Sequence, residues 1–128
     1  MRILAIDHGN ARAGTAICDP SGTIVRPLGV VSPPDPDEVV RLAAEHEAEA
    51  IVVGLPVSLG GGEGEQAAAA REFARRLAEL AEVPVDTYDE RLTTRMAAQT
   101  ARGGASAPPD ALAAAHLLES YLQSRGDG

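Results

Sequence analysis

The sequence predicts an α/β domain built on a five-stranded mixed sheet with helices on both faces. Three observations indicate this class. Short β-prone segments joined by tight turns fill residues 3–31, and helical and extended segments alternate after them. The apolar run at 50–53 is unbroken, as in a strand covered on both faces. This order fits an antiparallel three-stranded meander followed by two parallel strands.

The expected meander starts with Ile3–Ile6, an apolar run too short for a helix, which stops at Asp7. A second strand is expected within 12–19 and a third within 23–31, with an Asp-Pro-Ser-Gly turn between them. Pro27 lacks a backbone N–H, so it predicts an edge position or a β-bulge in the third strand.

The first helix is expected to begin after Asp35. This residue suits an N-cap, Pro36 suits the first helical position, and Glu38 has the spacing of a capping box. Three further helices are expected, and a short strand precedes the second of these three. The expected elements are a first helix to about 47, a second at 65–82, a strand at 84–88, a third helix from Thr93 or Thr94 to about Arg102, and a last helix at 109–123.

The second helix carries opposite charges four residues apart, in the pairs Glu72 with Arg76 and Arg75 with Glu79. Pairs at this spacing stabilise a helix only slightly. The charged face is therefore expected to face solvent.

The composition limits the classes of protein to which the chain can belong. Its 128 residues suit a single domain, expected over residues 1–123 with a flexible tail at 124–128. The single cysteine, Cys18, excludes an intramolecular disulfide and fits a reducing compartment. No apolar run approaches the length of a membrane span. We therefore expect a cytoplasmic protein with no membrane partner.

The charge gives two opposing indications about nucleic acid. The net charge of −8 opposes attraction of the whole molecule to phosphate. All 11 basic residues are arginine, whose planar guanidinium suits phosphate, and Arg91, Arg95 and Arg102 lie in a stretch to Pro109 without an acid. This stretch is interpreted either as a local phosphate-binding patch or as a compositional bias of an alanine-rich chain.

Three acids stand at the ends of expected elements. Asp7 ends the first strand, Glu90 follows the fifth, and Asp110 lies in the first turn of the last helix. Ligand sites of α/β sheets gather at the carboxyl ends of the strands. Clustered carboxylates need a cation, and Mg²⁺ or Mn²⁺ prefers oxygen ligands. Each acid also has a structural interpretation, as a turn cap, as the partner of a neighbouring arginine, or as a first-turn acid at the positive end of a helix.

Two glycines and a glycine-rich loop lie near these acids. Gly9 and Gly14 are expected to let the chain fold back tightly and to leave room for a metal ion or phosphate beside Asp7. The loop at 57–64 fits either a lid facing the substrate or a loose connection.

Four segments together resemble a known family. They are Asp-His-Gly-Asn-Ala-Arg-Ala-Gly-Thr-Ala (7–16), Val-Gly-Leu-Pro (53–56), Asp-Glu-Arg-Leu-Thr-Thr (89–94) and Asp-x-x-Ala-Ala (110–114). The chain is similar in these segments to the YqgF/RuvX family of ribonuclease H-like proteins, described as Holliday-junction resolvases or pre-16S ribosomal RNA nucleases. The resemblance covers nearly the whole chain, and the 89–94 segment is its most specific part.

The resemblance implies a ribonuclease H-like fold and a metal-dependent nuclease. It implies that Asp7, Glu90 and Asp110 are catalytic acids that hold one or two Mg²⁺ or Mn²⁺ ions, and that Arg12 and Arg91 bind the phosphates of nucleic acid. The expected reaction is attack of a metal-activated water on a phosphodiester bond in an RNA precursor or branched DNA. A two-fold symmetric junction needs two active sites, so a homodimer is expected for such a substrate.

The chain departs from the family pattern at two places. His8 stands where relatives usually carry an apolar or aromatic residue, and the small residues 103–107 replace a lysine-rich segment. Loss of those cations removes phosphate contacts. The acidic net charge and the missing lysines leave open a non-catalytic nucleic-acid-binding or ribosome-assembly module that keeps the fold. Asp-x-Gly alone also occurs in actin-like ATPases, so an actin-like phosphotransferase, which requires a second lobe, is a separate alternative.

Overall fold

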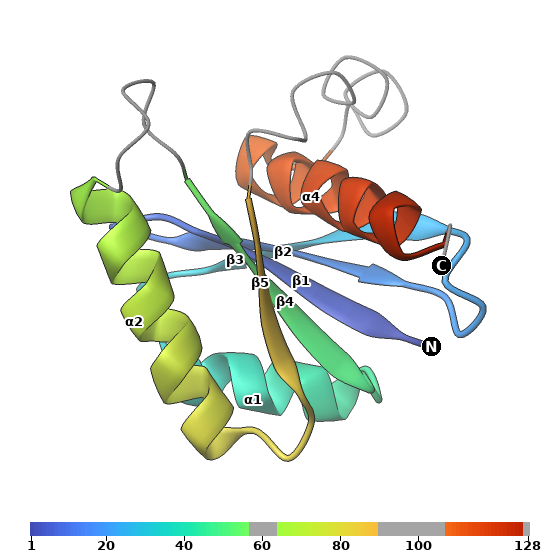
Figure 1. Ribbon diagram of the computed structural model, residues 1–128, viewed down its shortest axis with the longest axis horizontal. Coiled ribbons are helices and arrows are strands. Elements are labelled where there is room, and N and C mark those ends of the chain that lie inside the picture. Colours follow the sequence, from blue (N-terminus) through green and yellow to red (C-terminus); the bar gives the residue numbers. More distant parts are fainter. Residues whose placement is uncertain (57–63, 90–106, 127–128) are drawn as a thin grey trace.

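The computed structural model describes residues 1–56, 64–89 and 107–126 (Figure 1). The expected helix ending near Arg102, and all of the 57–64 loop except its last residue, lie outside this description.

The predicted five-stranded mixed sheet is confirmed. The strand order is β3-β2-β1-β4-β5, with antiparallel pairing of β1 with β2 and of β2 with β3, and parallel pairing of β1 with β4 and of β4 with β5. The meander therefore forms one half of the sheet and the two parallel strands form the other. The strands are β1 (Ile3–His8), β2 (Ala13–Cys18), β3 (Val25–Val31), β4 (Ala50–Leu55) and β5 (Val85–Asp89).

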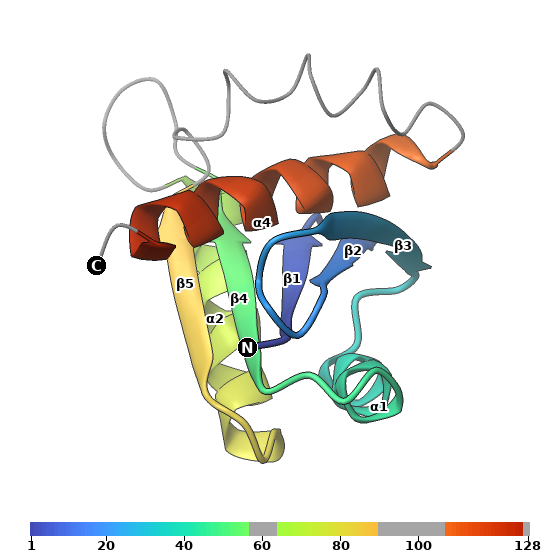
Figure 2. The same cartoon turned by 90° about the vertical axis from the view of Figure 1, so that its right-hand side faces the viewer.

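Helices cover both faces of this sheet, as predicted. The helices α1 (Pro36–Glu45) and α2 (Glu65–Leu80) lie on one face, and α4 (Pro109–Gly126) lies on the other (Figures 1 and 2). Each face has its own apolar cluster, built almost wholly from Ala, Val, Leu and Ile. None of the helices in the described ranges is both long and apolar enough to cross a membrane.

Local signals in the sequence set the start of α1 and the irregularity of β3. Asp35 is the N-cap of α1 and accepts a hydrogen bond from the N–H of Asp37 at 3.0 Å, with a proline in the first turn. Glu38 contacts Arg41 on the same helix. The strand β3 lies at the edge of the sheet, and its register against β2 shifts next to Pro27. Both consequences that this proline suggested therefore occur.

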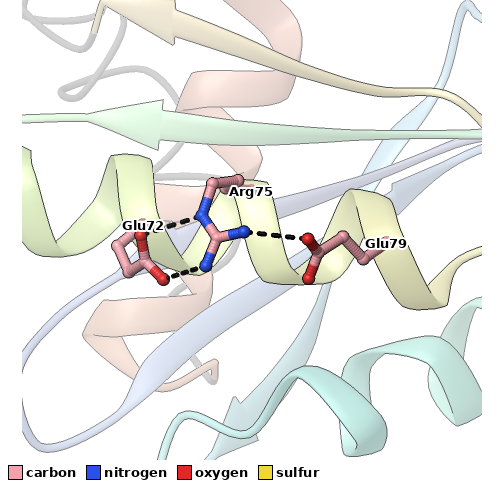
Figure 3. A network of polar contacts seen from close by, with 3 residues as sticks. All are labelled: Glu72, Arg75 and Glu79. Atoms are coloured by element: carbon pink, nitrogen blue, oxygen red, sulfur yellow. Dashed lines mark hydrogen bonds and ion pairs between the residues drawn. The ribbon is translucent and has the colours of Figure 1, made fainter.

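The charged face of α2 is exposed, as expected, and the predicted ion pair of Arg75 with Glu79 is confirmed. Glu72 pairs with Arg75 as well. Arg75 lies between Glu72 and Glu79 and bonds to both carboxylates, at 2.5 and 3.0 Å on one side and 2.8 Å on the other (Figure 3). The predicted partner of Glu72 was Arg76. The planar guanidinium of Arg75 has donors on two edges, so a single side chain serves both acids.

The last helix continues to Gly126, three residues beyond its expected end at 123. Tyr121 stabilises this additional turn. The hydroxyl of Ser124 donates to the carbonyl of Tyr121 at 2.8 Å, and the guanidinium of Arg125 donates to the Tyr121 hydroxyl at 3.0 Å.

Candidate metal and nucleic-acid site

Side chains of β1 alternate between the two faces of the sheet and thereby orient Asp7. Ile3 and Ala5 belong to the apolar cluster beneath α4, whereas Leu4 and Ile6 belong to the cluster beneath α1 and α2. Asp7 lies two residues after Ala5 and therefore faces the same side of the sheet. Its half-buried side chain thus lies on the α4 face, at the carboxyl end of the strand.

Glycines flank Asp7 on both neighbouring strands. Asp7 pairs with Gly14 of β2 and with Gly54 of β4. A Cβ added to Gly14 would lie 1.8 Å from the carbonyl oxygen of Asp110 and 2.3 Å from its carbonyl carbon. The first turn of α4 therefore lies directly on β2, next to the strand that carries Asp7.

The expectation that Gly14 leaves room for a metal ion or phosphate is therefore wrong. The backbone of α4 takes up that space. Gly54 is a residue that sequence reasoning did not single out, although the Val-Gly-Leu-Pro motif contains it.

Gly9 has the predicted role in a tight turn. Its N–H donates to the carbonyl of Arg12 at 3.0 Å, and a Cβ on Gly9 would lie 2.8 Å from the same oxygen. The turn joining β1 to β2 is consequently compact and places Arg12 near the start of β2.

Arg12 contacts Asp110 across this end of the sheet. The Nε of Arg12 lies 2.6 Å from Oδ2 of Asp110, and the two side chains are 62% and 38% exposed. The fold thus brings a predicted phosphate-binding cation into an ion pair with a predicted metal ligand.

His8 points away from these acids. Its ring lies 4.8 Å from the ring of Phe73, on α2, at a tilt of 42°. Burial lowers the pKa of His8, and the carboxylate of Asp7 opposes that shift. His8 is therefore a packing residue of the α2 face, which explains how an aromatic residue suits the same position.

Glu90 and Arg91 lie outside the described residues. The last described residue before them, Asp89, pairs with Leu55 of β4. Because Asp7 pairs with the preceding Gly54, β5 ends at the same edge of the sheet as β1.

Within the described ranges, no group of three or more His, Cys, Asp or Glu side chains is gathered as a metal site. Those ranges supply two of the three expected ligands, Asp7 and Asp110. Their carboxylate oxygens are the hard donors that Mg²⁺ and Mn²⁺ prefer, so the donor chemistry fits these ions.

Solved structures of low sequence identity share this fold. Thermus thermophilus RuvC in complex with a Holliday junction substrate superposes with a TM-score of 0.67 at 20% identity, covering 98% of this chain and 96% of that one. The fowlpox virus Holliday junction resolvase gives a TM-score of 0.58 at 13% identity, covering 97% and 99%. These likenesses confirm the predicted ribonuclease H-like fold.

Closer relatives are found by sequence. A protein of Thermobifida fusca described as "Putative pre-16S rRNA nuclease" is 48% identical, over 80% of this chain and 67% of the relative. A Streptomyces coelicolor protein of the same description is 42% identical, over 96% and 80%. A family model described as "RuvX: Holliday junction resolvase" matches residues 1–124. This match and these identities confirm the resemblance found in the four sequence segments: the chain belongs to the RuvX family.

Proposed function

We propose that this protein is a divalent-metal-dependent nuclease that hydrolyses phosphodiester bonds in structured nucleic acid. The expected substrates are precursors of 16S ribosomal RNA, Holliday-junction-type DNA, or both. The descriptions of the family model and of the curated relatives support this activity.

A single contact carries the proposal in this chain. The first turn of α4, which carries Asp110, lies on Gly14, and Gly14 pairs with Asp7. This packing supports a site shared by the two acids. Glu90, the residue after β5 in the sequence, is the third proposed catalytic acid. An acidic site of this kind repels phosphate unless a cation neutralises it.

Asp7, Glu90 and Asp110 would hold one or two Mg²⁺ or Mn²⁺ ions, which would supply Lewis-acid activation of water and neutralisation of charge at the phosphate. The chain itself supplies position. Asp7 is fixed by strand pairing on both sides, and Asp110 is fixed by the packing of α4 on Gly14. Arg12 and Arg91 are the proposed phosphate contacts, with guanidinium donors suited to phosphate oxygens.

Replacement of Asp7 tests the activity. The Asp7→Asn variant keeps the size of the side chain and removes its charge. We expect cleavage of ribosomal RNA precursors and four-way junctions to fall by about a hundredfold or more, as for loss of a metal ligand. Asp37→Asn, the same change at an exposed acid of α1, is the matched control. Undiminished cleavage by Asp7→Asn would refute the proposal.

The alternative is a binding module without catalysis. The ion pair of Arg12 with Asp110 favours it, since this contact neutralises one acid without a metal ion. Calorimetric titration with Mn²⁺ separates the two functions. Binding that is lost in Asp7→Asn and in Asp110→Asn supports the nuclease, and absence of any carboxylate-dependent binding supports the module.

Location and assembly are part of the proposal. A cytoplasmic protein accords with the single cysteine, Cys18, which is free and buried. Residues 1–123 are proposed as a single nuclease domain. A homodimer is proposed only for a two-fold symmetric junction, and sedimentation in the presence of such a junction tests it.

A further inference from the structure

A groove lies between β3 and α1, on the face of the sheet opposite to Asp7 and α4. It has a volume of about 610 Å³. Its sheet side includes Thr15, Leu28 and Gly29, and its helix side includes Leu42 and His46. We refer to this cavity as the β3–α1 groove.

Gly29 leaves the sheet side of the β3–α1 groove open. A Cβ added to Gly29 would meet no atom within 4 Å. The hydroxyl of Thr15 donates to the carbonyl of Gly29 and accepts from its N–H, each at 3.1 Å. The N–H and the carbonyl of Gly29 are thus both hydrogen-bonded to Thr15 of β2. An occupant of the groove has no need to replace these two bonds.

Two leucines and three acids are among the residues that line the groove. Leu28 and Leu42 both pack against the apolar cluster beneath α1 and α2 while lining the groove. They offer an occupant a patch of aliphatic contact, which favours a ligand with apolar side chains over a purely ionic one.

Three carboxylates line the groove, from Asp35, Glu38 and Glu45, and none of the described residues that line it is an arginine. Two of these acids already have partners: Asp35 caps α1, and Glu38 contacts Arg41. Glu45 is exposed in the last turn of α1, which carries no basic residue. The carboxylate of Glu45 and the negative end of the helix dipole therefore both make the electrostatic potential more negative at this end of the groove.

We propose that the β3–α1 groove binds an arginine- or lysine-rich segment of a partner protein. Aliphatic side chains of that segment cover Leu28 and Leu42, and its cations lie beside Glu45 and the end of α1. The acidic wall repels nucleic acid, and the net charge of −8 opposes binding of a second copy. The groove lies across the sheet from Asp7, so a bound segment leaves the proposed nuclease site accessible.

The test uses the full chain and a short fluorescent peptide in which arginine alternates with valine and leucine. Fluorescence polarisation at low salt measures binding, and amide chemical shifts locate it. We expect shifts centred on Thr15, Gly29 and His46. A peptide with glutamate in place of arginine should not bind.

Two variants probe the groove in different ways. Gly29→Phe places a ring at the sheet side of the groove and should abolish peptide binding, and a Cβ at this position meets no atom within 4 Å. Glu45→Lys reverses the charge at the end of α1, where a cation favours the helix, and should weaken binding about three- to tenfold. Glu82→Lys makes the same change at an exposed acid outside the groove and should leave binding unchanged.

Several results would overturn the proposal: peptide-induced shifts at another surface, equal binding by wild type and Gly29→Phe, or shifts at the same amides caused by RNA. Self-association that Gly29→Phe abolishes would assign the groove to a second copy instead. Cleavage of protein-free nucleic acid by Gly29→Phe should equal that of wild type. Failure of peptide binding is thereby distinguished from failure of the proposed nuclease function, on which this inference does not depend.

Discussion

The guanidinium of Arg12 and the carboxylate of Asp110 lie 2.6 Å apart, and this contact joins the first hairpin to the last helix. The sequence suggested different tasks for the two residues, phosphate binding and metal binding. Both side chains are partly exposed, so the ion pair adds little to stability. Its main effect is to place an internal cation where the proposed metal ion is expected to act.

Replacement of Arg12 should therefore change the affinities for metal and for nucleic acid in opposite directions. In Arg12→Gln, Asp110 loses a competing cation and the local negative potential rises, so we expect Mn²⁺ to bind about two- to fivefold more tightly. Binding of nucleic acid should weaken, with a shallower salt dependence. Calorimetry measures the first change and filter binding with Ca²⁺ the second. An unchanged Mn²⁺ affinity would show that the ion pair with Arg12 does not weaken metal binding by Asp110.

Gly14→Ala should destabilise the fold, because the new methyl group would overlap the carbonyl of Asp110. Backbone atoms of a packed helix yield little, so we expect a loss of about 1–3 kcal/mol in the free energy of unfolding. Urea unfolding measures it. Gly29→Ala is the matched control, since its methyl group meets open space, and it should leave stability unchanged or slightly raised. Equal losses in both variants would contradict the packing of α4 on β2.

His8→Phe should keep both stability and cleavage. The ring contact with Phe73 is preserved, and the side chain lies on the face opposite to Asp7. His8→Ala should lose about 0.5–1.5 kcal/mol of stability, the usual contribution of an aromatic pair. Thermal unfolding and cleavage assays on both variants check this. A large loss of cleavage in stably folded His8→Phe would assign His8 a part in the site.

His116 should make the protein less stable in mild acid. This residue is 7% exposed, and its Nδ1 has no hydrogen-bond partner among the described residues. Burial lowers the pKa of His116 below its ordinary value of 6.5, against the opposing effect of Glu119.

The unfolded chain therefore takes up a proton at a higher pH than the folded chain does. The contribution of neutral His116 is complete above about pH 6.5 and is lost as the pH falls towards the lowered value. His116→Leu should flatten the dependence of the unfolding temperature on pH below this point. A dependence as steep as that of wild type would exclude His116 as its source.

Local signals made most elements predictable. An N-cap followed by proline set the start of α1 at Asp35. Pro27 predicted an edge position or a bulge, and β3 shows both. Strict alternation along β1 would also have predicted that Asp7 and His8 face opposite sides. These features depend on a few neighbouring residues, so the sequence contains them directly.

Contacts between distant segments were not predictable in the same way. The absent side chain of Gly14 suggested an empty space, but nothing local indicates that α4 fills it. The pairing of Arg12 with Asp110 depends on the same long-range packing. Glu90 and Arg91 stay predictions from the family resemblance, because they lie outside the described residues.

The packing of α4 against Gly14 also has a consequence for the order in which the protein folds. This contact closes a loop that contains most of the chain, and such contacts form only after the entropy of ordering the intervening segments has been overcome. A partly folded chain with an undocked last helix has Asp7 on its strand but lacks Asp110 beside it. Under the proposed function, catalytic competence and the completed native fold are therefore acquired in the same step.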